Sequence, residues 1–306
     1  MTSRRAFLSA AAVAAAAAAL RPLPVFAASP VPRESALATR AIPSSGERIP
    51  IIGMGTSGSF EVDAAGREPL EEVLRRFVAG GASVIDTSPN YSNAEDVLGD
   101  LLAELGLRDR IFLATKLAAD DRPAGEAQFA QSLKRLRTDK VELLAVHNLR
   151  DWRNQLTLAR DLKEQGKTRY IGLTHYQDSA HHELARIMAA EKPDFIQINY
   201  SVGAPNAERA LLPLARDLGV AVMINRAFDD GRLFSRVADR PLPGWAAEAG
   251  VTSWAQMFLK FTTGHPAVTV VIPATGKPDR QSDNLKAGLG RDLTEAERAE
   301  LVTMFA

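Results

Sequence analysis

The chain has 306 residues, and its 37 lysines and arginines are balanced by 37 aspartates and glutamates. A hydrophobic share of 46% is that of an ordinary globular protein and excludes the disordered and collagen-like classes. The formal net charge of zero gives no sign of a nucleic-acid partner. The absence of cysteine excludes disulfides, thiolate nucleophiles and iron–sulfur clusters.

The first 27 residues resemble a twin-arginine (Tat) signal peptide. Arg4 and Arg5 precede an alanine-rich apolar run over residues 6–20, and residues 25–27 read Val-Phe-Ala, like a cleavage site. The apolar run is shorter than the roughly 20 residues of a membrane span. We therefore expect a signal peptide over 1–27, recognition by the Tat translocase, export of the folded chain to the periplasm, and no membrane span after cleavage.

Residues 28–37 are rich in Pro and Ser and are predicted to form a linker, so the folded domain is expected over 38–306. The domain begins with two short apolar segments on either side of residues 44–47 (Ser-Ser-Gly-Glu), which predict a β-hairpin. Continuous apolar runs then predict eight buried strands: Ile51–Met54, Ser83–Asp86, Ile111–Thr115, Val141–His147, Arg169–Leu173, Phe195–Ile198, Val220–Ile224 and Val268–Ile272.

Amphipathic stretches lie between these runs, and Gly follows several of them, as is common after helices. The predicted helices are Pro69–Ala79, Ala94–Leu105, Glu126–Leu136, Asn154–Gln165, Ser179–Ala190, Ala207–Leu218, Ser253–Thr263 and Glu295–Phe305. Eight strands alternating with helices predict a single-domain (β/α)8 TIM barrel with the hairpin at its base. A doubly wound sheet is the alternative, but no G-x-G-x-x-G follows the first strand.

The active sites of such barrels lie at the carboxyl ends of the strands. Four polar side chains follow three consecutive predicted strands: Asp86 and Tyr91, then Lys116, then His147. Taken singly, each has an ordinary structural explanation, such as a loop cap for the Asp or a satisfied core position for the His. On one rim they form an acid–base site.

The chemistry of this set is specific. A phenol has a pKa of about 10, and a nearby ammonium should lower that of Tyr91. Asp86 can keep Lys116 charged, and His147 can donate a hydrogen bond to a carbonyl oxygen. Tyr91 could then protonate an alkoxide as it forms. None of these groups carries a hydride, so a cofactor must.

These residues resemble the aldo-keto reductase superfamily, over about residues 40–290. Asp86-Thr-Ser-Pro-Asn-Tyr91 has the spacing of that family's D-x-x-x-x-Y, and Lys116 and His147 lie in similar contexts. The resemblance implies a catalytic tetrad of Asp86, Tyr91, Lys116 and His147, with Tyr91 as general acid or base. It implies interconversion of a carbonyl and an alcohol by direct hydride transfer with NADP(H) or, less often, NAD(H).

The resemblance also implies a nicotinamide site. Gly55 and Thr56 match the family's Gly-Thr after the first strand, and Gln197 matches a glutamine that contacts the carboxamide. Thr174 and His175 would contact the same group, although His175 stands where the family has Asn.

Further along, Asn225 stands where many members place an aromatic residue on the nicotinamide ring, and Arg226 could instead contact the cofactor phosphates. After the last strand Thr275, Arg280 and Asn284 match the family's adenosine-phosphate motif, in which Ala274 replaces a lysine. A guanidinium suits a 2′-phosphate, so we favour NADP over NAD. The alternative for Arg280 is a solvated helix charge.

The loops on the catalytic rim are short, so we expect an open site. Trp152 is predicted to overhang it and Phe60 to form a second wall, although Trp152 could instead pack against the next helix. The substrate would be a small carbonyl compound or alcohol. No metal is expected, because the adjacent His181 and His182 would point in different directions on a helix.

Two other functions stay open at this point. The first is a dinucleotide-binding, redox-sensing protein of the same fold. The second is a barrel isomerase or lyase in which Lys116 forms a Schiff base with its substrate. The combination of Asp86 with Tyr91 argues against the second.

Overall fold

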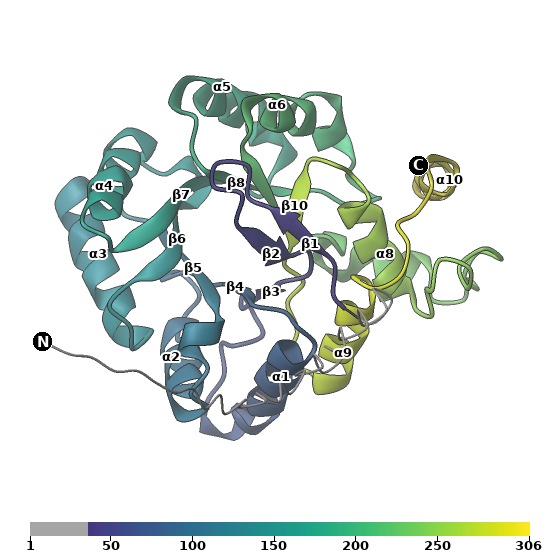
Figure 1. Cartoon of the computed structure of the whole chain (residues 1–306), viewed down its shortest axis with the longest axis horizontal. Coiled ribbons are helices and arrows are strands. Elements are labelled where there is room, and N and C mark those ends of the chain that lie inside the picture. Colours follow the sequence, from purple (N-terminus) through teal and green to yellow (C-terminus); the bar gives the residue numbers. More distant parts are fainter. Residues whose placement is uncertain (1–35) are drawn as a thin grey trace, which may run out of the picture. The chain divides into compact units, whose positions relative to one another are not determined.

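The computed structural model describes residues 36–306, which form a barrel of parallel strands surrounded by helices (Figure 1). The strands neighbour one another in chain order. They are β3 (Met54–Gly55), β4 (Val84–Asp86), β5 (Phe112–Leu117), β6 (Val141–Val146), β7 (Thr168–Thr174), β8 (Phe195–Asn199), β9 (Ala221–Asn225) and β10 (Val268–Val271). The ring closes between its first and last members through parallel bridges from Ile52 to Val271 and from Gly55 to Ala274. The predicted (β/α)8 barrel is confirmed.

The helices cover the outside of the barrel (Figure 1). They are α1 (Glu68–Ala79), α2 (Ala94–Glu104), α3 (Arg122–Arg135), α4 (Trp152–Glu164), α5 (His181–Glu191), α6 (Leu211–Leu218), α7 (Arg232–Arg236), α8 (Trp254–Thr263), α9 (Pro278–Lys286) and α10 (Glu295–Phe305). Side-chain caps set several starts: Asp121 accepts from the Ala124 amide at 2.8 Å, and Ser253 from that of Gln256 at 3.1 Å. The sequence did not predict α7 and α9.

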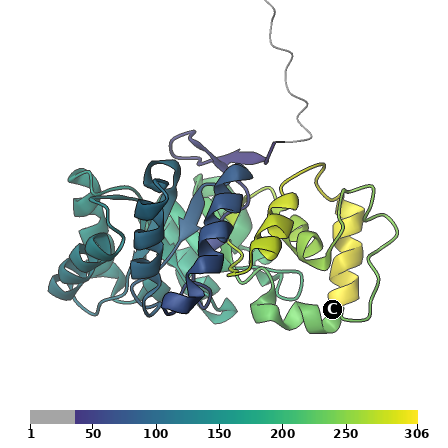
Figure 2. The ribbon, with the colours of Figure 1, turned by 90° about the horizontal axis from the view of Figure 1, so that it is seen from below.

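The hairpin consists of β1 (Thr39–Ala41) and β2 (Arg48–Pro50), which pair antiparallel. Ile42 and Ile49 pack with Phe112 and Phe195, the first residues of two barrel strands. The hairpin therefore covers the end at which the strands begin, and Figure 2 shows it lying across one end of the barrel. The carboxyl ends of the strands stay open at the other end.

Arg40 ties this hairpin to the last part of the chain. Its guanidinium donates to the backbone carbonyls of Thr263, His265 and Val268. Thr263 ends α8, and Val268 begins β10. These contacts join positions more than 220 residues apart in the sequence. They fix the hairpin on the base of the closed barrel.

The predicted signal peptide over 1–27 and most of the predicted linker lie outside the described residues. Between 36 and 306, no helix is both long enough and apolar enough to cross a bilayer. The apolar core of this part has two layers: one fills the barrel, and the other lies between the barrel and its helices. Phe60 belongs to the outer layer and is 0% exposed.

Candidate active site

Asp86 and Lys116 form a buried ion pair between two neighbouring strands. Asp86 is the last residue of β4, and Lys116 lies near the end of β5. The lysine Nζ is 2.7 Å from Asp86 Oδ2 and also donates to the Thr87 carbonyl oxygen at 2.7 Å. Lys116 is 0% exposed. Burial disfavours its charge, yet the interactions with Asp86 and Tyr91 raise the pKa of Lys116 above its ordinary value.

The Tyr91 ring lies against this pair, with Lys116 Nζ 5.2 Å from the ring centroid. Burial raises the pKa of the Tyr91 phenol; the Lys116 charge acts the other way, and the Asp86 charge adds to the rise. Lys116 lowers this pKa, as expected, but burial of the phenol outweighs the lysine, so the expected net decrease is wrong. Tyr91 is therefore a protonated acid at neutral pH.

His147 completes the group, with its ring edge-on to Tyr91 at 5.9 Å between centroids. It follows β6, and its Nδ1 is 3.1 Å from the Ser88 hydroxyl. Burial, together with the charges of Lys116, His175 and Arg150, lowers the pKa of His147 to about 3. The imidazole is thus neutral at physiological pH. Because Ser88 occupies Nδ1, the other ring nitrogen is the one free for a ligand.

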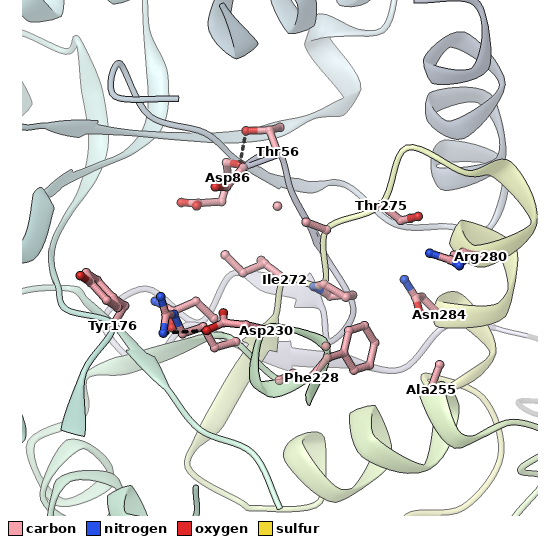
Figure 3. A pocket seen from close by; sticks show the side chains of 18 of the residues that line it. Thr56, Asp86, Tyr176, Phe228, Asp230, Ala255, Ile272, Thr275, Arg280 and Asn284 are labelled. Atoms are coloured by element: carbon pink, nitrogen blue, oxygen red, sulfur yellow. Dashed lines mark hydrogen bonds and ion pairs between the residues drawn. The ribbon is translucent and has the colours of Figure 1, made fainter. Parts of the chain in front are cut away.

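One cavity of about 990 Å³ contains three of these four side chains, and Lys116 lies behind its wall. Tyr91, His147 and Asp86 line one part of it, and Arg280 and Asn284 line another. In Figure 3, Asp86 and Thr56 face Thr275, Arg280 and Asn284 across this space. The predicted residues that line the cavity are Gly55, Thr56, Asp86, Tyr91, His147, Gln197, Asn225, Arg226, Thr275, Arg280 and Asn284.

The segment after β10 supplies the part of the cavity around Arg280. Thr275 accepts a hydrogen bond from the Lys277 amide at 3.2 Å, just before α9 begins. Arg280 is exposed in the first turns of α9 and forms no ion pair with any residue between 36 and 306. Asn284, one helical turn later, is only 3% exposed. The Arg280 guanidinium is thus available to a ligand, and the buried Asn284 amide lies one turn away. Such a pair suits a phosphate attached to a nucleoside.

The end of β9 supplies a second place for a polar ligand. Asn225 lines the cavity, and its Oδ1 is buried without a hydrogen-bond partner among the described residues. A buried acceptor of this kind needs a donor, such as an amide of a bound molecule. The next residue, Arg226, has a left-handed backbone with φ of 53°. Its guanidinium lies 4.3 Å from the centroid of Tyr176 and pairs with Asp230 at 3.0 Å.

Two predicted cofactor residues lie outside the cavity lining. The Thr174 hydroxyl accepts from the Asn148 amide at 3.0 Å. His175 stacks on Tyr176, and its Nδ1 accepts from the Gln177 amide at 3.2 Å. The Thr174 hydroxyl thus holds the segment after β6, and His175 holds the turn after β7. The cavity is lined there by Tyr176 instead.

The two predicted substrate walls are also placed elsewhere. Phe60 is wrong as a wall, because it is fully buried in the layer between barrel and helices. Trp152 is the first residue of α4 and packs against that same layer, with the Arg153 guanidinium 4.4 Å from its ring centroid. Neither residue lines the cavity. The packing alternative for Trp152 is the one that the structure supports.

Several other residues line the cavity that were not predicted from the sequence. Phe228, Phe234 and Trp254 supply aromatic surface, and Asn148 lies beside His147. Phe228 and Phe234 are 5.1 Å apart between ring centroids. A weak signal existed for Trp254, which follows the N-cap residue Ser253 of α8. Nothing in the local pattern distinguishes Phe228 and Phe234 from core residues.

Comparisons with known proteins identify the family of this chain. The profile of the aldo/keto reductase family matches residues 51–304. The chain is 29% identical to methylglyoxal reductase YeaE of Escherichia coli, over 83% of this chain and 90% of that protein. It is 27% identical to aldo-keto reductase YhdN of Bacillus subtilis, over 61% of this chain and 61% of that protein, so this match spans less than two thirds of the relative.

Solved structures give the same result. An aldo/keto reductase from Klebsiella pneumoniae, determined with NADP and acetate, aligns with a TM-score of 0.73 and 27% identity. The alignment covers 85% of this chain and 93% of that one. The thermostable aldo-keto reductase Tm1743 also has a TM-score of 0.73, at 24% identity, and supports the fold. Because the family profile extends over most of the chain, from the first barrel strand into the last helix, this protein belongs to the aldo/keto reductase family.

Proposed function

We propose that the protein reduces a small aldehyde or ketone to an alcohol with NADP(H). The observation that carries this proposal is the buried Asp86–Lys116 pair beneath Tyr91, with a neutral His147 beside it. All four side chains lie at or behind the wall of a cavity large enough for a dinucleotide and a small substrate. Arg280 lines the same cavity and supports the choice of a phosphorylated nucleotide.

Each residue of the group has a defined task. The free ring nitrogen of neutral His147 donates a hydrogen bond to the carbonyl oxygen and orients it. Tyr91 transfers its phenolic proton to that oxygen as negative charge develops there. The Lys116 ammonium stabilises the resulting phenolate, and Asp86 keeps the ammonium charged and in place. A proton from solvent restores Tyr91 after the alcohol leaves.

The cavity residues fit NADP(H), which when bound supplies the hydride for the carbonyl carbon. Arg280 and Thr275 would hold the 2′-phosphate, and Asn284 the adenine. Asn225 Oδ1 would accept from the nicotinamide carboxamide, which gives this buried atom its missing donor. The Klebsiella structures described with NADP and with NADPH support the choice of cofactor. NADP is favoured over NAD, although Ala274 removes one cation near the phosphate.

A fluorescence titration with NADPH and NADH, followed by an aldehyde and the decrease in absorbance at 340 nm, tests the proposal. We expect tighter binding of NADPH and turnover that Tyr91→Phe abolishes without weakening NADPH binding. Binding without turnover on any carbonyl would favour the redox-sensing alternative. No binding of either dinucleotide would contradict both.

We also propose export of the folded chain to the periplasm, supported by Arg4 and Arg5 and the apolar run that follows them. Fractionation of cells that express the wild type and an Arg4→Lys/Arg5→Lys variant tests this. We expect the wild type in the periplasm with dinucleotide still bound, and the variant in the cytoplasm. Equal distribution of the two proteins would contradict export through the twin-arginine route.

A further inference from the structure

Glu95 is a buried carboxylate that the proposed reaction does not use. It lies in the first turn of α2, is 1% exposed, and forms no ion pair with any residue of the described part. Acidic side chains are rarely buried without a cationic partner. Burial raises the pKa of Glu95, while hydrogen bonds from Thr115 and Ser132 oppose the rise. The burial of the Glu95 carboxylate therefore requires a structural or functional explanation.

Both oxygens of Glu95 are occupied by hydroxyl donors from two different elements. Thr115, on β5, donates to Oε1 at 2.7 Å, and Ser132, on α3, donates to Oε2 at 3.0 Å. Both hydroxyl-bearing residues are buried, Thr115 at 0% and Ser132 at 1% exposure. Glu95 thus joins α2 to a barrel strand and to the neighbouring helix in the buried interior.

The strand end of this link lies next to the catalytic lysine. Thr115 directly precedes Lys116, and consecutive residues of a strand point to opposite faces. The Thr115 side chain therefore points outward to Glu95 while that of Lys116 points into the barrel. Holding Thr115 fixes the position and rotation of the strand that carries the ammonium.

The helix end of the link lies next to the catalytic tyrosine. The Tyr91 carbonyl accepts from the Ala94 amide at 2.8 Å, so the backbone of Tyr91 is part of the turn that begins α2. Glu95 is the following residue. One turn later, a Cβ on Gly99 would lie 2.1 Å from the Arg135 carbonyl oxygen, so α2 and α3 are in backbone contact on the same face.

We infer that Glu95 is a positioning residue. By bonding α2 to the outer face of β5, it fixes the distance between the Tyr91 phenol and the Lys116 ammonium on the inner side of the barrel. This inference rests on the proposed function. Its ordinary alternative is a purely structural link between helices, which would affect stability but not the acid–base chemistry. The hydroxyl partners separate the two, because Thr115 adjoins Lys116 whereas Ser132 lies on a helix with no tetrad residue.

The experiment compares Glu95→Ala, Glu95→Gln, Thr115→Val and Ser132→Ala in the full chain, with kcat, KM for the aldehyde, NADPH affinity and melting temperature measured for each. Misplacement of a reacting group by 1 Å can reduce a rate by about 100-fold. We expect kcat to fall by about that factor in Glu95→Ala and by about tenfold in Thr115→Val. KM and NADPH affinity should change little.

Two variants serve as matched controls. Glu95→Gln keeps an acceptor for Thr115, and the Ser132 hydroxyl can turn to accept from the new amide, so kcat should recover to within about threefold of wild type. Ser132→Ala should lower the melting temperature without lowering kcat. Equal kcat in wild type and Glu95→Ala would overturn the inference. So would equal kcat losses in Thr115→Val and Ser132→Ala. If Glu95→Ala does not fold, the comparison of these two variants decides.

A second readout does not depend on turnover. The ultraviolet titration of Tyr91, taken as the difference between each protein and its Tyr91→Phe counterpart, reports the distance of the ammonium. Because Lys116 lowers the pKa of Tyr91, its displacement in Glu95→Ala should raise that pKa further. If the wild type reduces no carbonyl, the proposed function fails, and this titration still tests the position of Tyr91. An unchanged titration would then overturn the inference.

Discussion

Gln197 donates a hydrogen bond from Nε2 to Asp86 Oδ1 at 2.9 Å, while Lys116 occupies the other oxygen of the same carboxylate. Asp86 is therefore held on both sides, by an amide from β8 and an ammonium from β5. Removing the Lys116 ammonium would therefore destabilise the protein, because the buried Asp86 carboxylate would lose the one cation that it pairs with among residues 36–306. Because Gln197 Nε2 is used in this way, its Oε1 is the atom that can accept a hydrogen bond from a ligand.

Lys116→Met should therefore destabilise the protein strongly. Removing one partner of a buried ion pair costs about 3–5 kcal/mol, because the other charge stays buried and unpaired. Lys163→Met is the control, since Lys163 is 40% exposed in its pair with Asp194 and such pairs contribute at most about 1 kcal/mol. Urea denaturation measures both values. Similar losses in the two variants would contradict the account of the Asp86–Lys116 pair.

The rate of carbonyl reduction should be insensitive to pH near neutrality. Tyr91 acts as an acid and its pKa lies above the ordinary value of about 10, so activity is lost only as pH rises past that point. His147, with a pKa of about 3, stays neutral over the whole range. A profile of kcat from about pH 5 to 11 checks this. A decline of kcat between about pH 6 and 8 would show that a different group titrates.

Acid should unfold the protein partly through His147. Its folded pKa of about 3 lies below the ordinary 6.5, so between these values the unfolded chain binds a proton that the folded chain does not. Stability therefore falls as pH falls through this window, by about 1.4 kcal/mol for each unit. We expect His147→Gln to reduce this slope, measured by denaturation between pH 7 and 4. An unchanged slope in His147→Gln would contradict this account.

Arg280 should determine how tightly the nucleotide phosphate is held. A charge-assisted hydrogen bond contributes about 1.5–3 kcal/mol, so Arg280→Ala should raise the Kd for NADPH by about 10- to 100-fold and that for NADH much less. Ala274→Lys should act in the opposite direction, since it adds a cation beside the same segment. Lys286→Ala, at the end of α9 and outside the cavity lining, is the control. Equal losses for the two cofactors in Arg280→Ala would place the 2′-phosphate elsewhere.

Gly99 should be intolerant of a side chain. An added Cβ would lie 2.1 Å from the Arg135 carbonyl oxygen and 2.7 Å from Leu136 Cα, so α2 and α3 would have to separate. We expect Gly99→Ala to lower the free energy of unfolding by about 1–3 kcal/mol. At Gly244 a Cβ would meet nothing within 4 Å, so Gly244→Ala should be nearly neutral. Thermal melts of both variants test this contrast.

The sequence was most informative where the barrel's geometry repeats. Parallel strands buried on both faces require continuous apolar runs, and these runs located all eight strands to within a few residues. The carboxyl ends of such strands share one rim, so Asp86, Lys116 and His147 could be brought together without coordinates. The first strand was the least well placed, because only Met54 and Gly55 keep regular pairing with β4.

The errors concern side-chain direction and local electrostatics. Phe60 and Trp152 lie in loops or at a helix start, where no periodicity tells which way a side chain points. The Thr174 and His175 side chains accept hydrogen bonds from the backbone amides of Asn148 and Gln177, and the sequence gives no sign of either contact. The raised pKa of Tyr91 depends on how deeply the phenol is buried, which composition and spacing do not contain.

The three hydrogen bonds of Arg40 carry a consequence for how the chain is made. The hairpin emerges early in synthesis, but the carbonyls that receive its guanidinium belong to Thr263, His265 and Val268. The β1–β2 pairing of the hairpin can form at once. The barrel surface that the hairpin packs against forms only after the last strand has been synthesised. Arg40 can therefore anchor the hairpin to the barrel only after residues 263–268 have been translated.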